Sequence, residues 1–382
     1  MKRSTQRILT THVGSLPAPS DLDRQLPDFN RRLRDSVLEI VRTQAQIGID
    51  IVNDGELSKG HWIAYLSSRL GGFTPAMSEN EPPHVPDGKD HESFPKFYEE
   101  AGRHGTLWYS SGYNIAGTNA LPRLVCTSAV SYTGASHVHA DIANLKAAAS
   151  AVRVEDTFLP VIAPASIAPY LANRYYGSEA EFLYALADAL RDEYEAIAHS
   201  GVLVQVDDAW TAALWDRIGI DAGLEAYRKR CFQFADILNH ALNRIPEEQI
   251  RYHICWGSWH GPHAYDLPMS DLVDVMLRVR AGAYLFEAAN ARHEHEYHVW
   301  ENVKLPVGKI IIPGVISHAT NLVEHPLLVS ERIQRFARLV GPENVIAGTD
   351  CGLGGRVHPE LAWAKLRSLV EGARLASQRL FS

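Results

Sequence analysis

Eight short, nearly continuous apolar segments are spaced along the chain, separated by segments with the periodicity of amphipathic helices. Strands that are apolar on both faces are typical of a parallel sheet covered by helices. Eight βα units predict an α/β fold of the closed (β/α)8 TIM barrel type, with a doubly wound open sheet as the alternative. The predicted strands cover residues 8–15, 50–56, 159–165, 202–207, 251–255, 283–287, 309–315 and 345–349.

The domain organisation follows from the spacing of these strands. No linker or internal repeat divides the 382 residues, so we expect one catalytic barrel domain over residues 1–382. Residues 57–157, between the second and third strands, are far too many for one crossover connection. They contain a polar, proline-bearing segment at 78–83 and a β-like segment at 124–132. We interpret 57–157 as an insertion that carries a lid or hairpin near the barrel mouth.

The charge balance and the hydropathy pattern exclude several classes of partner. The chain has 37 basic and 45 acidic side chains, a net charge of −8, which leaves no general basic surface for nucleic acid. It has neither an apolar run long enough to span a membrane nor a signal-peptide core, so we expect a cytoplasmic protein. Four scattered cysteines predict free thiols rather than disulfides. The sequence leaves open whether the chain forms a homo-oligomer.

Residue types that bind metals stand at the predicted carboxyl ends of three strands, where barrel enzymes assemble their sites. His253 and Cys255 are two positions apart and therefore point to the same face of one strand. Glu287 ends the next strand, and Cys351 follows the last one. One nitrogen, two sulfurs and one oxygen suit tetrahedral zinc, whereas magnesium prefers oxygen ligands alone.

Taken singly, each of these residues also has a structural interpretation. A cysteine in a strand is most often a small buried apolar residue. Glu287 is different, because a carboxylate that closes the apolar run 283–286 is costly to bury without a partner. The combination of four ligand residues at three strand ends favours a metal site.

A series of short motifs resembles the catalytic barrel of cobalamin-independent methionine synthase over most of the chain. The His-x-Cys at 253–255, the later Glu287 and the Asp-Cys-Gly at 350–352 are similar to motifs of that family. Four further segments match in the same order: Val13-Gly14-Ser15, Asp54-Gly55-Glu56, Gln205-Val206-Asp207-Asp208, and Pro313-Gly314-Val315 followed by His318.

The resemblance implies a zinc-dependent methyltransferase that moves a methyl group to a thiol, with homocysteine and a methylated folate as the family's substrates. It implies Zn²⁺ held by His253, Cys255, Glu287 and Cys351. It further implies that His318, with Asp350 nearby, donates a proton to the leaving group. The amino-acid part of the thiol would be bound by Val13, Gly14, Ser15, Glu56 and Asp207.

Three alternatives stay open at this point. Arg292, His260 and His263 are candidates to bind a sulfonate or carboxylate, which is similar to the zinc epoxyalkane:coenzyme M transferase branch, a thiol alkyltransferase. A metal-free barrel like that of uroporphyrinogen decarboxylase would have no use for the cysteines as ligands. In a third alternative the zinc ion is purely structural. The sequence names neither the thiol nor the methyl or alkyl donor.

Overall fold

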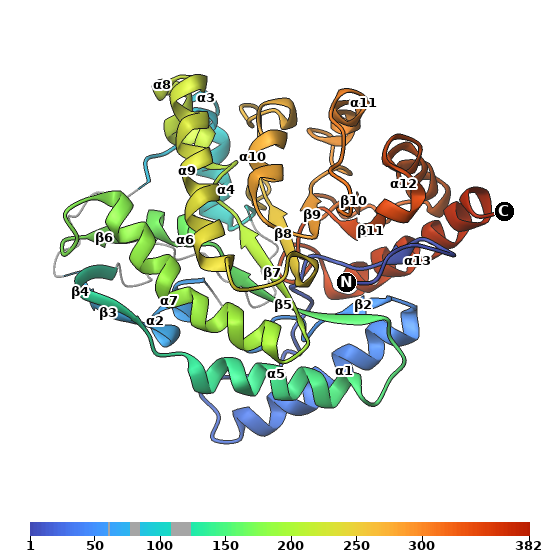
Figure 1. Cartoon of the computed structure of the whole chain (residues 1–382), viewed down its shortest axis with the longest axis horizontal. Helices are drawn as coiled ribbons and strands as arrows, with labels where there is room; N and C mark the ends of the chain where they lie inside the picture. Colours follow the sequence, from blue (N-terminus) through green and yellow to red (C-terminus); the bar gives the residue numbers. More distant parts are fainter. Residues whose placement is uncertain (60–61, 77–84, 108–123) are drawn as a thin grey trace.

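The computed structural model describes residues 1–59, 62–76, 85–107 and 124–382. Eight parallel strands form a nearly closed barrel in the order β1-β11-β10-β9-β8-β7-β5-β2 (Figure 1). The backbone N–H of Asp50 donates to the Thr10 carbonyl at 3.2 Å and links the two ends of this sheet. The barrel strands are β1 (Leu9–Thr10), β2 (Ile51–Val52), β5 (Asp156–Ile162), β7 (Leu203–Asp208), β8 (Ile250–Ile254), β9 (Ala283–Phe286), β10 (Ile310–Ile316) and β11 (Ile346–Thr349).

The principal helices alternate with the strands along the chain and surround the barrel, which confirms the predicted TIM-barrel architecture. Local residues fix one end of two of these helices: Ser178 caps the first turn of α7 by accepting the Glu181 N–H, and Gly48 ends α1 with a φ of 100°. The ring consists of α1 (Phe29–Ile47), α5 (Ala135–Ala149), α7 (Glu179–His199), α9 (Leu224–Leu242), α10 (Val273–Arg278), α11 (Val299–Asn302), α12 (Pro326–Val340) and α13 (Pro359–Leu380).

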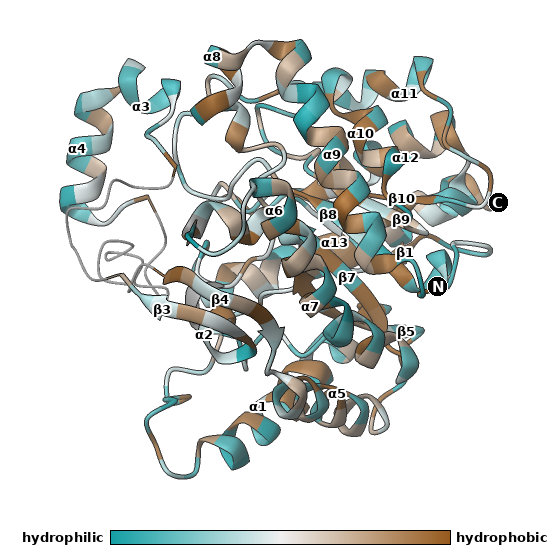
Figure 2. Ribbon diagram, turned by 60° about the vertical axis from the view of Figure 1, so that its left-hand side comes forward, coloured by the Kyte–Doolittle hydropathy of each residue, from teal (hydrophilic) through white to brown (hydrophobic). Residues whose placement is uncertain are grey.

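Apolar side chains form two layers, one inside the barrel and one between strands and helices, while polar residues colour the outer helix faces in Figure 2. The inner layer also holds Arg251, whose guanidinium lies 3.8 Å from the Phe158 ring centroid and donates to Thr11 and His12. This packed layer closes the barrel below the site. The apolar members of the inner layer are Leu9, Val13, Ile51, Phe158, Leu203, Ala283, Leu285, Ile310, Ile312 and Ile346.

The first two strands are shorter than predicted, because the chain leaves the sheet early to form the loops 11–16 and 53–59. Between β2 and β5 lie α2 (Trp62–Arg69), β3 (Leu70–Pro75), α3 (Lys89–Ser93), α4 (Pro95–His104), β4 (Leu124–Tyr132) and α5. Strand β4 covers the predicted β-like segment and pairs antiparallel with β3 and parallel with β6 (Leu171–Asn173). The segment 78–83 lies outside the described residues, and the lid function of 57–157 stays a prediction.

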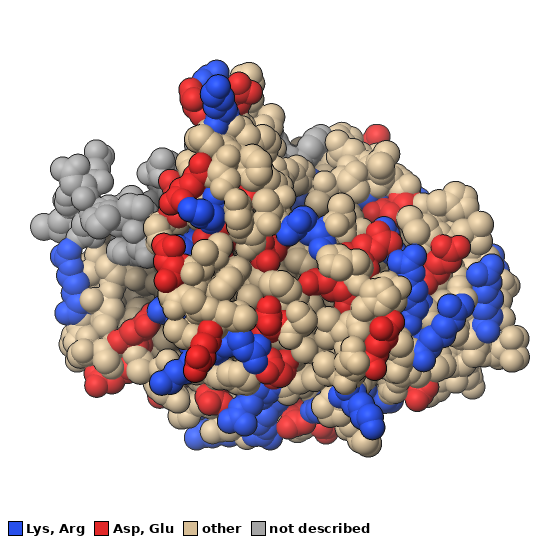
Figure 3. Space-filling model, turned by 90° about the horizontal axis from the view of Figure 1, so that it is seen from above, with Lys and Arg blue, Asp and Glu red and all other residues tan. Residues whose placement is uncertain are grey.

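Two further observations concern the surface. Acidic and basic side chains are interspersed over the face shown in Figure 3, in keeping with a chain that has both signs in similar numbers. Among the described residues, no helix combines the length and apolar character needed to cross a bilayer.

Candidate metal and thiol site

The sequence-predicted site residues lie at the carboxyl ends of the barrel strands or in the loops that follow them. His253 belongs to β8 and is paired in register with Asp207 of β7. Its Nδ1 lies 3.0 Å from Asp207 Oδ1, and both side chains are buried. The other ring nitrogen, Nε2, is buried and has no hydrogen-bond partner among the described residues. A carboxylate on one nitrogen and an unpaired second nitrogen are typical of a metal-binding histidine.

Both predicted ligand cysteines lie beside this nitrogen. The Sγ atoms of Cys255 and Cys351 are 3.9 Å apart, and ligand atoms of His253, Cys255 and Cys351 all lie within 4.8 Å of one another. Glu287 Oε1 lies 3.7 Å from Cys255 Sγ. All four residues are buried. The structure therefore brings His253, Cys255 and Cys351 together and places the fourth predicted ligand, Glu287, beside Cys255.

This donor set fits a zinc ion. Two soft sulfur donors, one imidazole nitrogen and one carboxylate oxygen are ligands that zinc takes in proteins, and buried thiols side by side need a counterion once they ionise. The unpaired Nε2 of His253 is the strongest structural sign, because a buried polar atom normally has a partner. Cys126 and Cys231, the two other cysteines, are buried elsewhere and lie outside this cluster.

The site shifts the pKa values of these groups in the absence of a metal. The Cys255 thiol donates toward Cys351, which holds the pKa of Cys351 below its ordinary value and raises the pKa of Cys255. Burial raises the pKa of Glu287 to about 7, an effect that the neighbouring His293 opposes. These directions describe a pair of thiols that shares one proton, an arrangement that a divalent cation would replace.

Glu56 lies against the loop Val13-Gly14-Ser15. A Cβ atom on Gly14 would come within 2.3 Å of Glu56 Oε1, so the backbone at Gly14 approaches the carboxylate closely. Glu56 itself has a φ of 60°, a conformation that non-glycine residues rarely adopt and that often occurs at functional sites. Burial, together with Asp207 and Asp54, raises the pKa of Glu56 to about 8.

Gln205 connects the loop Val13-Gly14-Ser15 to the cluster of candidate metal ligands. Its Nε2 donates to the Val13 carbonyl and, at 2.9 Å, to Asp207 Oδ1. Asp207 thus accepts hydrogen bonds from Gln205 and contacts His253 at the same oxygen. Its neighbour Asp208 is satisfied by Thr211, Tyr252 and Ser166 and has a structural role. Two predicted substrate-binding acids, Glu56 and Asp207, therefore flank the loop at Val13.

His318 and Asp350 lie close to Glu287. Ligand atoms of Glu287, His318 and Asp350 are within 4.8 Å of one another. Asp350 accepts the backbone N–H groups of Ala288 and Ala289, each at 2.8 Å. Burial lowers the pKa of His318 well below its ordinary value, and the positive charge of Arg356 adds to this effect.

Sequence reasoning missed Arg356 and Ser258, which border the same site. Arg356 Nε donates to Ser258 Oγ at 2.7 Å, and Nη1 donates to Ser15 Oγ at 3.0 Å. The available signal was the position of Arg356, which closes the glycine-rich loop directly after Cys351. By contrast Arg292, which the sequence suggested for anion binding, is exposed and donates to the Ala264 carbonyl.

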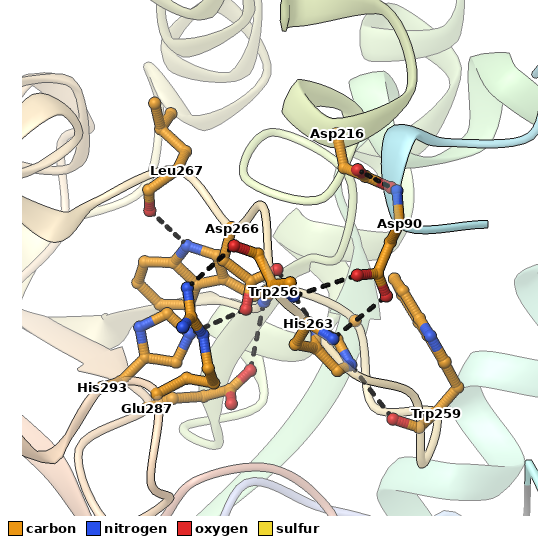
Figure 4. A network of polar contacts seen from close by, with 12 residues as sticks. Asp90, Asp216, Trp256, Trp259, His263, Asp266, Leu267, Glu287 and His293 are labelled. Atoms are coloured by element: carbon orange, nitrogen blue, oxygen red, sulfur yellow. Dashed lines mark hydrogen bonds and ion pairs between the residues drawn. The ribbon is translucent and has the colours of Figure 1, made fainter. Parts of the chain in front are cut away.

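A network of hydrogen bonds, ion pairs and ring contacts connects Glu287 to helix α3 (Figure 4). The Trp256 N–H donates to Glu287 Oε1 at 3.1 Å, and the Trp256 ring lies against His293, with 4.3 Å between centroids. His293 contacts Asp266, which also contacts His263. Asp90 of α3 then accepts the His263 N–H at 3.1 Å. The loop after Cys255 is therefore held between Glu287 and the segment inserted before β4.

Comparison with known proteins gives matches along almost the whole chain, although no family model matches it. A methionine synthase from Thermococcus kodakarensis is 21% identical, with 97% of this chain and 94% of that protein covered. A methionine synthase from Saccharolobus islandicus is 22% identical, with 97% and 95% covered. The 2-hydroxypropyl-CoM lyase of Xanthobacter autotrophicus is 24% identical, with 98% and 96% covered.

Solved structures agree in fold. A B12-independent methionine synthase from Shewanella sp. W3-18-1, in complex with selenomethionine, aligns with a TM-score of 0.73 at 17% identity, covering 98% of this chain and 99% of that one. A putative vitamin-B12-independent methionine synthase from Listeria monocytogenes aligns with a TM-score of 0.64 at 17% identity, covering 96% and 98%. This chain is therefore similar over nearly its full length to methionine synthases and to 2-hydroxypropyl-CoM lyase, and it shares the fold of the B12-independent methionine synthases.

Proposed function

We propose that this protein is a zinc-dependent enzyme that transfers a methyl group to the thiol of homocysteine. The observation that carries the proposal is the contact between His253 and Asp207, which joins the cluster of ligand residues to the acidic pocket at Glu56. The family relationship supports a methyltransferase, because sequence relatives over nearly the full length are methionine synthases.

His253, Cys255, Glu287 and Cys351 would hold the zinc ion. A zinc ion bound there would lower the pKa of a coordinated thiol, so that the sulfur is ionised at neutral pH. The four side chains are buried, which keeps water from competing with the thiol. The Asp207 carboxylate fixes the ring orientation of His253 through Nδ1 and leaves Nε2 pointing away from the carboxylate.

The acidic pair selects an amino-acid thiol. Asp207 is buried and Glu56 is partly buried; the charge of Asp207 adds to the effect of burial in raising the pKa of Glu56, and an α-ammonium group between the two carboxylates would oppose this effect. Homocysteine carries this ammonium group, whereas coenzyme M does not. The loop Val13-Gly14-Ser15 approaches Glu56 at Gly14 and Gly352, the neighbour of Cys351, at Ser15, and it would orient the chain of the substrate.

His318 is the group that we propose to hold the proton for the leaving atom of the methyl donor. Burial and the neighbouring Arg356 make its imidazolium form a strong acid, which favours release of the proton once it is protonated. The Asp350 carboxylate accepts the backbone N–H groups of Ala288 and Ala289 and so fixes the backbone next to Glu287. We therefore propose that Asp350 positions Glu287 in addition to balancing the charge of His318.

A second candidate function is alkylation of the coenzyme M thiol, which the relationship to 2-hydroxypropyl-CoM lyase favours. Coenzyme M brings a sulfonate and no ammonium group, so binding would leave Glu56 and Asp207 unneutralised. The acidic pair therefore favours the amino-acid thiol. A metal-free reaction of the uroporphyrinogen decarboxylase type is the alternative that a zinc-free protein would favour.

One experiment separates these functions. The protein is purified without chelator, its zinc content is measured, and thiol consumption is followed with homocysteine or coenzyme M in combination with methyltetrahydrofolate or epoxypropane. We expect about one zinc per chain and consumption of homocysteine with the methyl donor. Zinc below about 0.2 per chain, without recovery on addition, would contradict the zinc-dependent reactions. Consumption of coenzyme M with epoxypropane alone would favour the second function.

A further inference from the structure

The segment that follows β9 wraps around the carboxylate of Asp350. The backbone N–H groups of Ala288 and Ala289 donate to Asp350 Oδ1, each at 2.8 Å. The side-chain amide of Asn290 donates to the other oxygen, Oδ2, at 3.2 Å. Because Asp350 directly precedes Cys351 in the chain, these three hydrogen bonds fix the segment relative to that proposed zinc ligand.

Asn290 also binds Glu287. Its Nδ2 donates to Glu287 Oε2 at 2.7 Å, so one amide group bridges the two buried carboxylates of Glu287 and Asp350. Ligand atoms of these two acids and of His318 lie within 4.8 Å of one another, a spacing that would also suit a second cation. The amide takes the place of such a cation, because it supplies one N–H to each carboxylate.

The orientation of the Asn290 side chain is fixed from the other end of its amide. Asn290 Oδ1 accepts the backbone N–H groups of Arg292 at 2.9 Å and of His293 at 3.1 Å. The Asn290 carbonyl accepts the Glu294 N–H at 2.9 Å, so the chain turns tightly at this residue. Because Oδ1 faces these backbone donors, Nδ2 faces the carboxylates. The amide is therefore oriented toward Glu287 before any ligand binds.

The two oxygens of Glu287 have different neighbours. Oε1 lies 3.7 Å from Cys255 Sγ and accepts the Trp256 N–H at 3.1 Å (Figure 4). Oε2 is held by Asn290. Glu287 would therefore offer Oε1 to a zinc ion at the cysteines, since turning Oε2 toward the ion would break the hydrogen bond to Asn290.

Both oxygens of Glu287 keep a hydrogen bond from the protein when the carboxylate is not a metal ligand. An ionised carboxylate is costly to bury alone, and N–H donors reduce this cost. A zinc ion with four protein ligands has no open position, so a thiol that binds to it must replace one of them. Glu287 is suited to this exchange, because the Trp256 N–H and the Asn290 amide stabilise its carboxylate after release.

We propose that Asn290 is a positioning residue that restricts Glu287 to one metal-binding oxygen and stabilises its released carboxylate, so that the substrate thiol can replace it. The inference rests on the proposed function, in which Glu287 is the fourth zinc ligand. In the exchange the bond to Glu287 Oε1 breaks, the bond to the substrate sulfur forms, and the thiol proton passes to the solvent. Without Asn290, Oε2 would be free to turn toward the metal, and the released carboxylate would lose a charge-assisted hydrogen bond. Both effects favour Glu287 over the thiol.

The test measures metal binding and thiol binding separately. Zinc affinity is determined by competition with a chromogenic chelator. Homocysteine binding is followed on the cobalt(II)-substituted protein, whose visible absorption changes when a sulfur ligand replaces an oxygen ligand. The variants are Asn290→Ala and Asn290→Ser, since a serine hydroxyl retains an acceptor for the turn but offers no amide donor to Glu287. The thermal unfolding midpoint of each variant is recorded alongside.

The matched control is Asn239→Ala. Asn239 of α9 fastens a loop in the same way, by donating to the Arg278 carbonyl at 2.9 Å and accepting the Arg280 N–H at 2.7 Å. That loop precedes β9, whereas the turn at Asn290 follows it. The control therefore removes the same kind of side chain from the opposite end of the strand, and we expect it to change neither affinity.

We expect both Asn290 variants to bind homocysteine about 10- to 100-fold more weakly, because the released carboxylate loses a hydrogen bond. Their zinc affinity should equal or exceed that of the unaltered protein, since Glu287 stays on the metal. A parallel loss of zinc and thiol affinity in Asn290→Ser would overturn the inference in favour of a purely structural role, as would unchanged thiol binding. If Asn290→Ala fails to fold, Asn290→Ser decides, because its turn keeps an acceptor.

The same measurements separate this inference from the proposed function. If the unaltered protein holds neither zinc nor cobalt, or if homocysteine leaves the cobalt spectrum unchanged, the proposed function fails and the inference fails with it. If homocysteine changes the spectrum at the same concentration in the unaltered protein and in both Asn290 variants, only the inference fails.

Discussion

Asp207 Oδ1 lies 3.0 Å from His253 Nδ1, at paired positions of two neighbouring strands. This contact means that Asp207 serves two parts of the site. Through His253 it orients a proposed zinc ligand, and through its position beside Glu56 it contributes to the proposed ammonium pocket. A substitution of Asp207 should therefore weaken the binding of both the metal ion and the thiol substrate.

We expect Asp207→Asn to weaken zinc binding about 10- to 100-fold, because the amide binds the imidazole N–H less strongly and no longer raises the basicity of the ring. Competition with a chromogenic chelator measures this affinity. Asp236→Asn, on the exposed surface of α9, is the matched control. Zinc affinity equal to that of the unaltered protein would contradict the assignment of His253 as a ligand.

Cys351→Ala should remove zinc and activity while leaving the fold intact. The residue lies at the carboxyl end of the barrel, above the packed inner layer, so its loss should not disturb the strands. We expect zinc below about 0.2 per chain and an unchanged circular dichroism spectrum. Cys231→Ala, which removes a buried thiol of α9, is expected to keep its zinc. Collapse of the fold in Cys351→Ala would instead indicate a structural ion.

The barrel was predictable because its strands are continuous apolar runs, which a parallel sheet buried on both faces requires. The two short strands β3 and β6 were not predicted. β3 contains two glycines and a proline, β6 has only three residues, and both are stabilised by pairing with β4, which is distant in sequence. Their formation depends on contacts that no local pattern encodes.

The ligand residues could be selected because side chains two apart on a strand share a face, as His253 and Cys255 do. The hydrogen-bond partner of His253 could not be predicted in this way, because pairing with Asp207 depends on the register between β7 and β8. Arg356 was missed for a related reason. It lies in a loop, where no periodicity relates a residue to its neighbours, and its contacts with Ser15 and Ser258 arise only when three loops meet.

Glu56 should make the stability of the thiol-free protein depend on pH. Its pKa is about 8 in the folded protein because of burial, against an ordinary value of 4.5. The folded state therefore holds a proton that the unfolded chain releases between these values, and stability falls as pH rises from about 5 to 8. Glu56→Gln should remove this component, so the difference in unfolding midpoint between the two proteins should grow with pH. An equal pH dependence in both would contradict the raised pKa.

The ion pairs of Arg69 should contribute strongly to stability. Its guanidinium donates to Glu193 and to Asp141, both at 2.6 Å, and the three side chains are 4%, 1% and 5% exposed. Arg69→Met leaves two buried carboxylates without a counterion, so we expect a loss of about 3–5 kcal/mol in urea unfolding. The control is Arg103→Met, which breaks an exposed pair with Glu99 and should cost less than about 1 kcal/mol. Similar losses in both variants would contradict the role of burial.

Asp90 should hold the helices α3 and α4 against the loop that follows Cys255. Its carboxylate is buried and accepts the N–H groups of His263 and Ala264 and the Tyr98 hydroxyl, at 3.1, 3.0 and 2.8 Å. Asp90→Ala removes the carboxylate that accepts all three hydrogen bonds, so local opening of this segment becomes less costly. We expect trypsin to cleave after Lys96 or Arg103 about 10- to 100-fold faster, because cleavage follows the population of the open form.

Asp87→Ala, at an exposed position just before α3, is the matched control and should leave the cleavage rate unchanged. Because the same loop carries Trp256, whose N–H donates to Glu287, loosening at Asp90 should also reach the metal site. A faster exchange of bound zinc with a chelator in Asp90→Ala, at an unchanged number of zinc ions per chain, would demonstrate this connection. An unchanged exchange rate with faster cleavage would show that Asp90 holds α3 and α4 without influencing Glu287.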